Sequence, residues 1–407
     1  MAIRIPMSSP DISNAEVQAV LETLHTPTLS IGPRLEAFER AVAAIAGVKW
    51  GVGVNSGTSG LHLCVIAAGV GEGDLVITTP FSFIASANCV LYERGVPVFV
   101  DVDPATGNID PHLAASAADD LARGGAAADR WLPPALRGAR CAVGRLRALL
   151  PVHAFGQPAD MDPLLDAARN HNLAVIEDAC EAIGAAYKGR PAGSLGDAAV
   201  FAFYPNKQIT TGEGGMIVTN RKSWAHLFRS LRNQGRDVFD GWLNHTRLGY
   251  NYRLDELSAA LGLVQVRRLD ELLAKRARVA AWYNERLAGT EFIETPRLAP
   301  TTTHMSWFVY VVRILPPAQR DTVMRSLAER GIPSRPYFTP IHLQPFYRER
   351  FGYRSGEFPV TEYLGAVSLA LPFSSIMTEA QVDAVCEALC DAVRRSVPLL
   401  MMRGAER

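Results

Sequence analysis

A single lysine, Lys207, lies in a polar turn between two stretches of strand-forming residues. The segment FAFYPNKQITTGEGGMIVTN spans residues 201–220, and its turn is rich in glycine. A lysine amine beside apolar and aromatic residues loses part of its preference for the charged state, and the neutral amine can attack a carbonyl or aldehyde carbon. The pattern indicates Schiff-base chemistry, although a solvated loop lysine is the commoner case.

An acidic pair ends the preceding predicted strand. The segment LAVIEDACEA begins at Leu173, and its apolar run is typical of a buried parallel strand that ends in Glu177 and Asp178. Ligands of open α/β sheets gather beyond the carboxyl ends of the strands, where we expect Asp178 to lie. A carboxylate there can pair with the protonated pyridine nitrogen of a pyridoxal ring and keep the ring electron-withdrawing.

A Gly/Ser turn, Ser56–Gly60, follows another predicted strand and opens a helical pattern. Backbone amides at a helix start favour a phosphate group, and glycine lets that group approach closely. By itself such a turn can be a plain helix cap. In this order along the chain, however, the turn, the strand that ends in Asp178 and the loop that carries Lys207 together predict a site for pyridoxal phosphate.

These segments resemble the DegT/DnrJ/EryC1/StrS family of pyridoxal phosphate-dependent sugar aminotransferases, which have the fold-type I (aspartate aminotransferase-like) architecture. Further segments carry the resemblance over nearly the whole chain: LSIGPRLEAFERAVAAIAGV, PVFVDVDPATGNIDP, PVHAFGQPADMDPL and LGYNYRLDELSAALG. The resemblance implies that Lys207 forms the Schiff base with the cofactor. It also implies that Asp178 pairs with the pyridine nitrogen.

The resemblance implies the remaining cofactor contacts as well. Gly57 and Thr58 would bind the phosphate, and Phe83 would stack on the ring. Glu181 would lie at the cofactor's 3-hydroxyl. Asn251 of the GYNYR segment would reach the phosphate of the neighbouring subunit's cofactor, so a homodimer with shared active sites is expected.

Two positions differ from the commoner family pattern. Ala202 stands five residues before the lysine, where many members have a phosphate-binding serine, and Glu181 stands where many have glutamine. Loss of the hydroxyl donor weakens phosphate binding by about 0.5 to 1.5 kcal/mol unless Thr210, Thr211 or a water replaces it. The glutamate can alter the protonation of the bond between the lysine and the cofactor.

Six residues in three loops are the candidates for substrate contacts: Ser30, Gly32, His153, Arg335, Tyr337 and His342. Each has a structural alternative. The first two could belong to a plain helix-connecting turn, the third could be a satisfied buried histidine, and the last three could pack against the large domain.

The composition is that of a globular chain long enough for two or three domains. It has 407 residues, 48% of them hydrophobic, and 41 basic residues balance 41 acidic ones. This balance does not favour nucleic acid or an anionic membrane as a partner. The six scattered cysteines suggest neither a metal site nor a disulfide framework. Without a recognisable signal sequence or a long apolar run, a cytoplasmic location is expected.

Strand and helix patterns alternate between residues 50 and 220, which predicts an α/β fold with a mostly parallel seven-stranded sheet covered by helices on both faces. The expected strands are 51–54, 75–78, 97–100, 148–152, 173–177, 199–203 and 216–219. The segment Ala114–Arg147, rich in Ala, Arg and Gly, is expected to hold an inserted surface loop.

A long helical stretch from Leu254 to Leu287 is expected to link the sheet to a small C-terminal α+β domain. Residues 1–253 would then form the large cofactor-binding domain. Residues 254–407 would form the linking helix and the small domain.

The main prediction, which rests on the resemblance, is an aminotransferase that moves an amino group from glutamate or glutamine to a keto sugar, usually nucleotide-linked, or to a keto-cyclitol. Amino-sugar, cell-surface polysaccharide or antibiotic biosynthesis would be its setting. A sugar dehydratase on the same fold is one alternative, but family members of that type replace the lysine with histidine. A non-catalytic regulatory protein is the other, and the Lys207 and Asp178 pairing has no evident use in it.

Overall fold

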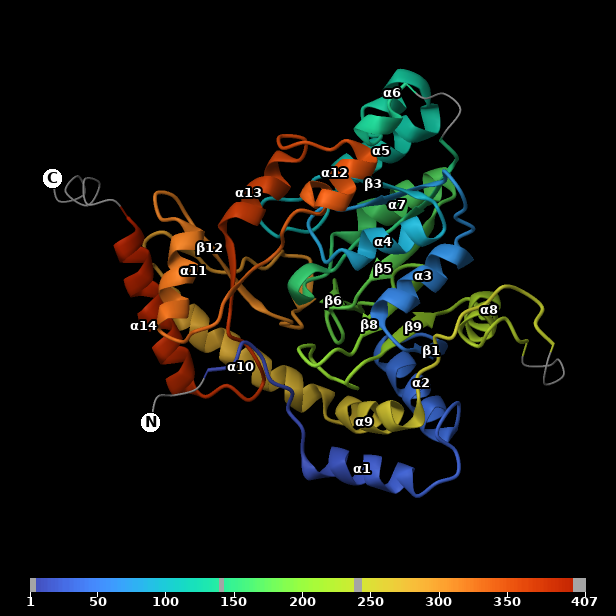
Figure 1. The fold of residues 1–407 in the computed structure, drawn as a ribbon, viewed down its shortest axis with the longest axis horizontal. Helices are drawn as coiled ribbons and strands as arrows, with labels where there is room; N and C mark the ends of the chain where they lie inside the picture. The colour runs from blue at the N-terminus through green and yellow to red at the C-terminus, as the bar shows by residue number, and fades with distance from the viewer. Residues whose placement is uncertain (1–4, 139–142, 238–243, 398–407) are drawn as a thin grey trace.

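The computed structural model describes residues 5–138, 143–237 and 244–397. A large α/β body contains a seven-stranded sheet of order β1-β9-β8-β5-β4-β2-β3 (Figure 1). Its strands are Trp50–Val54 (β1), Leu75–Thr78 (β2), Val96–Phe99 (β3), Leu146–Leu149 (β4), Ala174–Asp178 (β5), Ala198–Ala202 (β8) and Gly215–Thr219 (β9). Strand β9 is antiparallel to both neighbours, whereas β8, β5, β4, β2 and β3 are parallel. The predicted fold class is confirmed, and every predicted strand overlaps an observed one.

Helices cover both faces of this sheet because the side chains of each strand alternate between its faces. In β2, Leu75 and Ile77 pack with Leu164, whereas Val76 packs with Leu63 on the opposite face. The covering helices are Pro33–Ile45 (α2), Gly57–Ala67 (α3), Ala85–Tyr92 (α4), Pro111–Arg123 (α5), Met161–His171 (α7) and Lys222–Arg232 (α8). Helix α1 (Asn14–Leu24) packs on α9 (Glu256–Arg267).

The segment 114–147, which the sequence predicted to hold an inserted surface loop, is helix and strand over part of its length. Its first residues belong to α5, and a short helix, α6 (Gly125–Asp129), and strand β4 occupy later parts. An alanine face of α5 is buried against the sheet at Ala114, Ala117 and Ala118. This face has helical spacing, but its small side chains made it look like loop composition. Residues 139–142 lie outside the described residues.

The predicted linking helix is two helices, α9 (Glu256–Arg267) and α10 (Leu269–Leu287). The break is at Arg268, whose backbone leaves the helical region at φ −96° and ψ 5°. The Arg268 guanidinium donates to Glu16 of α1 at 2.6 Å. This contact with the N-terminal segment lies at the point where the chain turns from one helix into the next.

A smaller body follows α10. Its four-stranded sheet has the order β10-β12-β14-β13. The elements are Ile293–Glu294 (β10), Tyr310–Ile314 (β12), Arg320–Glu329 (α11), Arg335–Pro336 (β13), Ser368–Leu371 (β14) and Glu379–Ser396 (α14). Ile5 packs in its apolar cluster, so the first described residues contact this body and not the sheet of the large one.

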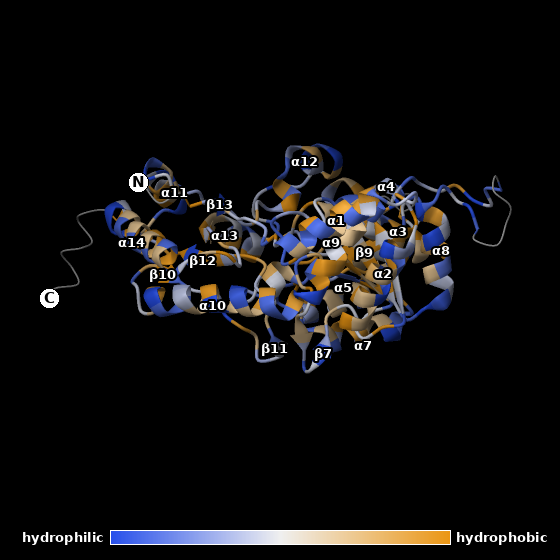
Figure 2. Cartoon of the chain, turned by 90° about the horizontal axis from the view of Figure 1, so that it is seen from below, coloured by the Kyte–Doolittle hydropathy of each residue, from blue (hydrophilic) through white to orange (hydrophobic). Residues whose placement is uncertain are grey.

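In Figure 2 the strand β9 in the large body is orange, whereas surface helices such as α8 carry blue, hydrophilic residues.

The remaining elements connect the two bodies. Helices α12 (Pro345–Phe351) and α13 (Pro359–Val367) follow β13, and a small sheet of order β11-β6-β7 comprises Thr302–His304, Ala186–Tyr187 and Arg190–Pro191. Tyr347 and Phe351 of α12 pack into a cluster of the large body. Within the described residues, none of the helices combines the length and the apolar character that crossing a membrane requires.

Candidate active site

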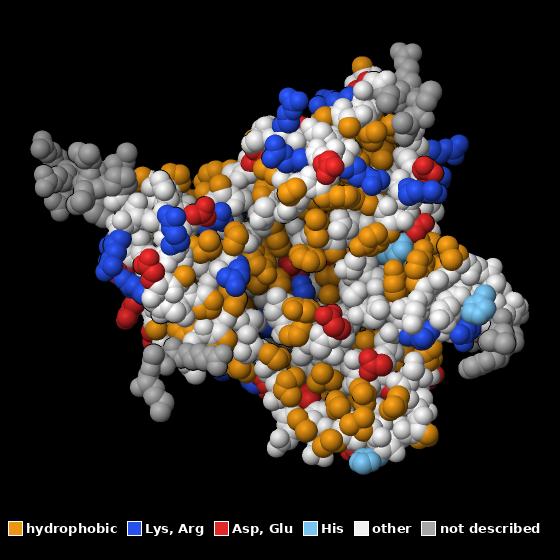
Figure 3. All heavy atoms as spheres, viewed as in Figure 1, with side chains coloured by type: hydrophobic (Ala, Val, Ile, Leu, Met, Phe, Trp, Pro, Cys, Tyr) orange, Lys and Arg blue, Asp and Glu red, His pale blue; other side chains and the backbone are white. Residues whose placement is uncertain are grey.

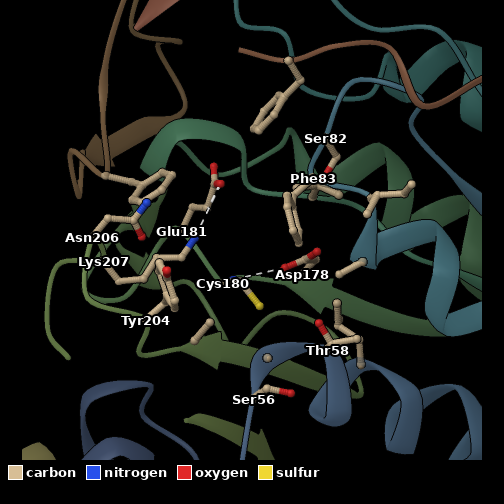
Figure 4. Close-up of a pocket in the computed structure, with 18 of the residues that line it drawn as sticks. Ser56, Thr58, Ser82, Phe83, Asp178, Cys180, Glu181, Tyr204, Asn206 and Lys207 are labelled. Atoms are coloured by element: carbon tan, nitrogen blue, oxygen red, sulfur yellow. Dashed lines mark hydrogen bonds and ion pairs between the residues drawn. The ribbon is translucent and has the colours of Figure 1, made fainter. Parts of the chain in front are cut away.

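A cavity of about 770 Å³ lies at the carboxyl ends of the parallel strands, where the space-filling view shows the surface hollowed between the two bodies (Figure 3). Its wall includes Lys207, Asp178, Glu181 and the start of α3 (Figure 4). The volume is within the usual range for small-molecule sites, about 300 to 1,000 Å³. The three sequence segments that predicted a cofactor site are therefore parts of one cavity wall.

The two acidic residues at the end of β5, Glu177 and Asp178, have different roles because the side chains of successive strand residues point to opposite faces of the sheet. Asp178 lines the cavity and accepts a hydrogen bond from the Cys180 amide at 3.2 Å. Glu177 points the other way and is fully buried. Its carboxylate accepts three backbone N–H groups, from Gly193, Leu195 and Gly196. Glu177 is therefore a structural residue, whereas Asp178 faces the cavity.

The amine of Lys207 lies between an acidic and an aromatic side chain. Its Nζ is 3.6 Å from Glu181 Oε1 and 3.8 Å from the centre of the Phe308 ring. The Lys207 side chain is 13% exposed. These contacts restrict the orientation of the amine, which faces the cavity that a carbonyl group would enter.

Two buried carboxyl groups face the cavity. Burial raises the pKa of Asp178 and the pKa of Glu181 above their ordinary values, and the Lys207 amine offsets only part of this effect. Glu181 Oε2 also accepts the Phe155 amide at 2.8 Å. Because one amine faces two carboxyls, the site favours a ligand that brings a positive charge or a hydrogen-bond donor.

The start of α3 is shaped to receive an anion. Ser56 caps the helix by accepting the Ser59 amide, and Gly57 and Thr58, which line the cavity, are the first two helical residues. Amides at these positions have no acceptor within the helix. A Cβ atom on Gly57 would lie 2.8 Å from both Ala202 Cβ and Cys180 Sγ, so this position has room only for glycine.

These groups match the parts of pyridoxal phosphate. The helix start suits its phosphate, and the Asp178 carboxylate suits its ring nitrogen. Phe83, which is 64% exposed, presents an aromatic ring to the cavity. The Lys207 amine suits the aldehyde of pyridoxal phosphate. The residues present therefore fit this group.

Introducing a hydroxyl at Ala202 is expected to tighten cofactor binding. Ala202 lines the cavity next to Gly57, whereas the hydroxyls of Thr210 and Thr211 bond to the carbonyls of Phe203 and Glu213 within the turn. Neither threonine replaces the missing donor. Ala202→Ser should lower the dissociation constant of pyridoxal phosphate up to about tenfold, one net hydrogen bond. Equilibrium dialysis measures it, and Ala202→Cys, with a weak donor of similar size, is the control. An equal or weaker affinity of the serine variant would contradict the assignment of the phosphate position.

Three candidates for substrate contacts lie away from the cavity wall. His153 is fully buried, and its Nδ1 accepts the Ala159 amide while its Nε2 is 2.9 Å from Glu177. His342 is fully buried and its Nε2 lies 3.1 Å from Glu362, so the expectation that it is exposed was wrong. Arg335 is exposed in β13 but does not line the cavity. Both histidines pair with a glutamate, Glu177 or Glu362, that the sequence could not identify as their neighbour.

Tyr337 does line the cavity, and burial, together with the nearby charge of Glu181, raises its pKa to about 12. Its hydroxyl is therefore protonated at neutral pH and can donate a hydrogen bond. Of the six substrate candidates, Tyr337 is the one that this chain brings to its own cavity.

The turn with Ser30 and Gly32 lies outside the cavity of its own chain. The Gly32 amide donates to Glu256 Oε1 at 2.9 Å, and the same oxygen accepts the Leu35 amide, so Glu256 caps the start of α2. Ser30 forms a backbone bridge with Asp255. Asn251 is exposed and is also not part of the cavity wall.

Several lining residues were missed by the sequence interpretation. They include Ser82, Tyr204, Asn206, Phe308, Phe338 and Gln344. Tyr204 and Asn206 flank Lys207 closely enough in sequence to have been suspected. Phe308 carried no local signal, because it lies in a segment that reads as a plain strand. Cys180 also lines the cavity, and burial raises the pKa of its thiol.

Several known proteins are similar in sequence to this chain over almost its full length. The sequence profile of the DegT/DnrJ/EryC1/StrS aminotransferase family matches residues 10–390. GDP-perosamine synthase of Caulobacter vibrioides is 41% identical over 390 residues, which are 95% of this chain and 97% of that protein. A pleiotropic regulatory protein of Geobacillus stearothermophilus is 35% identical over 93% of this chain and 95% of its own length.

A solved structure agrees with the fold. The crystal structure of S. venezuelae DesV in complex with a ketimine intermediate has a TM-score of 0.82 and 33% sequence identity, and covers 95% of this chain and 98% of that one. Both the matched profile and this likeness extend over the two bodies and the cavity between them. The chain therefore belongs to the DegT/DnrJ/EryC1/StrS aminotransferase family of pyridoxal phosphate-dependent enzymes, as its sequence predicted.

Proposed function

We propose that this protein transfers the amino group of glutamate or glutamine to a nucleotide-linked keto sugar in amino-sugar biosynthesis. The observation that carries the proposal is the convergence of the Lys207 amine and the Asp178 carboxylate in one cavity beside the start of α3. The name of the Caulobacter vibrioides relative, which contains a nucleotide sugar, supports the class of acceptor.

When bound, pyridoxal phosphate supplies an electron-withdrawing ring that stabilises negative charge on the carbon next to the amine. The Lys207 amine would hold the cofactor, be displaced by the amino donor, and then move a proton to or from that carbon. Asp178 would keep the ring nitrogen protonated. Glu181, 3.6 Å from Nζ, would pair with the ammonium of Lys207 whenever the amine is released. The Tyr337 hydroxyl would donate to an oxygen of the substrate.

The test of this function uses absorbance and mass spectrometry. Protein loaded with pyridoxal phosphate should show a visible band that borohydride abolishes, with the reduced cofactor attached to Lys207. Glutamate or glutamine should convert that band to the amine form of the cofactor, and a nucleotide keto sugar should restore it. A protein whose band withstands every amino donor would instead be a regulatory relative that binds the cofactor without turnover.

Replacing the Glu181 carboxyl by an amide is expected to stabilise the cofactor-free protein at neutral pH. Burial raises the pKa of Glu181 from its ordinary value of 4.5, so the folded protein holds this proton more tightly than the unfolded chain does. The resulting stabilisation is complete below that value and is lost as the pH rises through the raised pKa. Glu181→Gln has no carboxyl group to ionise at this position, so it does not lose this stability as the pH rises.

Thermal unfolding of wild type and Glu181→Gln between pH 4 and pH 8 measures this effect. The melting temperature of the variant should exceed that of wild type at the upper end, and the difference should shrink toward pH 4. Glu329→Gln, at an exposed position of α11, is the control and should follow the wild type. If the difference between Glu181→Gln and wild type does not change with pH, Glu181 titrates normally in the folded protein.

A homodimer with shared active sites forms part of the proposal. Asn251 is exposed, and the nearby side chain of Leu248 is 84% exposed. The turn with Leu29 and Ile31, which are 46% and 44% exposed, is held to the start of α9 four residues beyond Asn251. These exposed apolar side chains lie next to Asn251, which does not line the cavity of its own chain. A second copy of the chain would cover such a surface. Ser30 and Gly32 lie in the same turn and would approach the partner's cavity.

The space-filling view supports the same surface. Apolar side chains gather over α1 in Figure 3. Three apolar residues of this helix, Val17, Leu21 and Leu24, are 44% to 52% exposed. They lie on one side of the helix at a spacing of three and four residues, and α1 packs on α9 through its other side. A second copy on this surface would bury them.

Mixing an inactive variant with one that binds the cofactor weakly tests the shared site. Asn251→Ala should weaken cofactor binding by up to about tenfold, and Lys207→Ala should be inactive. A mixed dimer would contain one pocket with both residues intact, so random exchange should restore about a quarter of wild-type activity under cofactor-limiting conditions. Native mass spectrometry confirms the exchange. Mixed dimers without any gain in activity, or an active monomer, would overturn the shared site.

A further inference from the structure

Arg276 in α10 is a buried arginine without an acidic partner among the described residues. It is 2% exposed, and burial alone lowers its pKa to about 10, which leaves the guanidinium charged at neutral pH. Its Nε has no hydrogen-bond partner in the described part of the chain. A buried charge of this kind is costly, and an apolar side chain of similar volume is usually at least as stable. Arg276 therefore calls for a role that an apolar residue could not fill.

The acceptors of Arg276 come from two distant segments. Its Nη2 donates to the carbonyl of Lys207 at 2.8 Å. Its Nη1 donates to the carbonyls of Trp307 and Phe308 at 3.2 and 3.1 Å. The guanidinium also lies over the Phe373 ring, whose centre is 5.5 Å from Cζ. One rigid fork thus joins the backbone of the lysine turn to the backbone at the edge of the small body.

The two segments that Arg276 joins also meet through their side chains. The Lys207 amine lies 3.8 Å from the centre of the Phe308 ring. The backbone carbonyls of the same two residues, Lys207 and Phe308, both accept from the Arg276 guanidinium. Gln208 adds a second connection, because its Nε2 donates to the Glu181 carbonyl at 2.5 Å and to Ser306 Oγ at 2.7 Å.

We infer that Arg276 is a positioning residue, which holds the backbones of Lys207 and Phe308 together so that the amine stays between the Phe308 ring and Glu181. The inference rests on the proposed role of Lys207. In each turnover that amine must leave the cofactor and return to the same atom. With both carbonyls held, only the side chain moves, and the cost of misplacing a reacting group by an ångström is large.

The first test needs no cofactor. Amides of both segments are hydrogen-bonded, Lys207 to the Tyr204 carbonyl and Phe308 to the Phe155 carbonyl. In cofactor-free Arg276→Met, hydrogen–deuterium exchange of peptides covering 204–211 and 305–310 should accelerate on the order of tenfold or more, since hydrogen bonds to a charged group are lost. Arg276→Lys, which keeps the charge but not the fork, should show an intermediate effect and serves if the methionine variant does not fold.

Arg320→Met is the matched control. Arg320 also donates to two backbone carbonyls, those of Gly365 and Ser368 at 3.2 and 3.0 Å, but it does not contact the lysine turn. This variant should leave exchange at 204–211 unchanged even if it lowers the melting temperature. If Arg276→Met and Arg320→Met had the same effect on that segment, Arg276 would only be part of the general fold and the inference would fail.

The second test uses the loaded protein. In Arg276→Met the pH at which the absorbance of the lysine–cofactor bond titrates should shift, and kcat should fall on the order of tenfold with KM little changed, because the amine is misplaced and the substrate contacts are not. Arg276→Lys should recover part of both. An unshifted titration with normal kcat would overturn the inference. Faster exchange in a protein that transfers no amino group would leave the positioning intact and refute the proposed function instead.

Discussion

Lys207→Ala is expected to abolish amino transfer and leave the fold and cofactor binding largely in place. The variant loses the amine that lies between Glu181 and the Phe308 ring, and the described cavity wall contains no other lysine. Turnover should fall by at least about 10⁴-fold, because both covalent attachment and proton transfer are lost. The start of α3 and Asp178 remain to bind the cofactor.

Absorbance and borohydride reduction separate these effects. Bound cofactor in Lys207→Ala should show the band of the free aldehyde, and borohydride should attach none of it to the protein. Lys188→Ala is the control, since Lys188 pairs with Asp162 at the surface and does not line the cavity. Turnover at the wild-type rate in Lys207→Ala would eliminate the assignment of this lysine.

Asp178→Asn is expected to have the second largest effect. The amide keeps the shape of the side chain but cannot hold the ring nitrogen of the cofactor protonated, so kcat should fall on the order of 10²-fold to 10³-fold. Burial raises the pKa of Asp178, so the carboxylate is a cost to the cofactor-free fold at neutral pH. The melting temperature of the cofactor-free variant should therefore be equal to or higher than that of wild type.

Glu177→Gln is the matched contrast, one residue earlier on the opposite face of β5. Its carboxylate accepts three backbone amides and pairs with His153, so the variant should lose melting temperature while its kcat changes little. Steady-state kinetics and thermal unfolding of the two variants should show opposite patterns. Unchanged kinetics in Asp178→Asn would mean that another group protonates the ring nitrogen.

Local patterns in the sequence determined the sheet and the main parts of the candidate site. A buried parallel strand is an apolar run of four to five residues, and the residue at its carboxyl end, here Asp178, faces the ligand edge of the sheet. The glycine turn at Gly57 and the loop around Lys207 are equally local, because a helix start and a tight turn depend on a few adjacent residues. Pattern and spacing are sufficient for such features.

Tertiary structure decided everything that depends on contact between distant segments. Nothing near Phe308 or Arg276 in the chain indicates that one lies beneath the Lys207 amine and the other holds its carbonyl. His153 looked available because it follows a strand at the ligand edge, but its two nitrogens are taken by Glu177 and the Ala159 amide. A side chain's type states which bonds it can make, and only the packing of the folded chain decides which of them it makes.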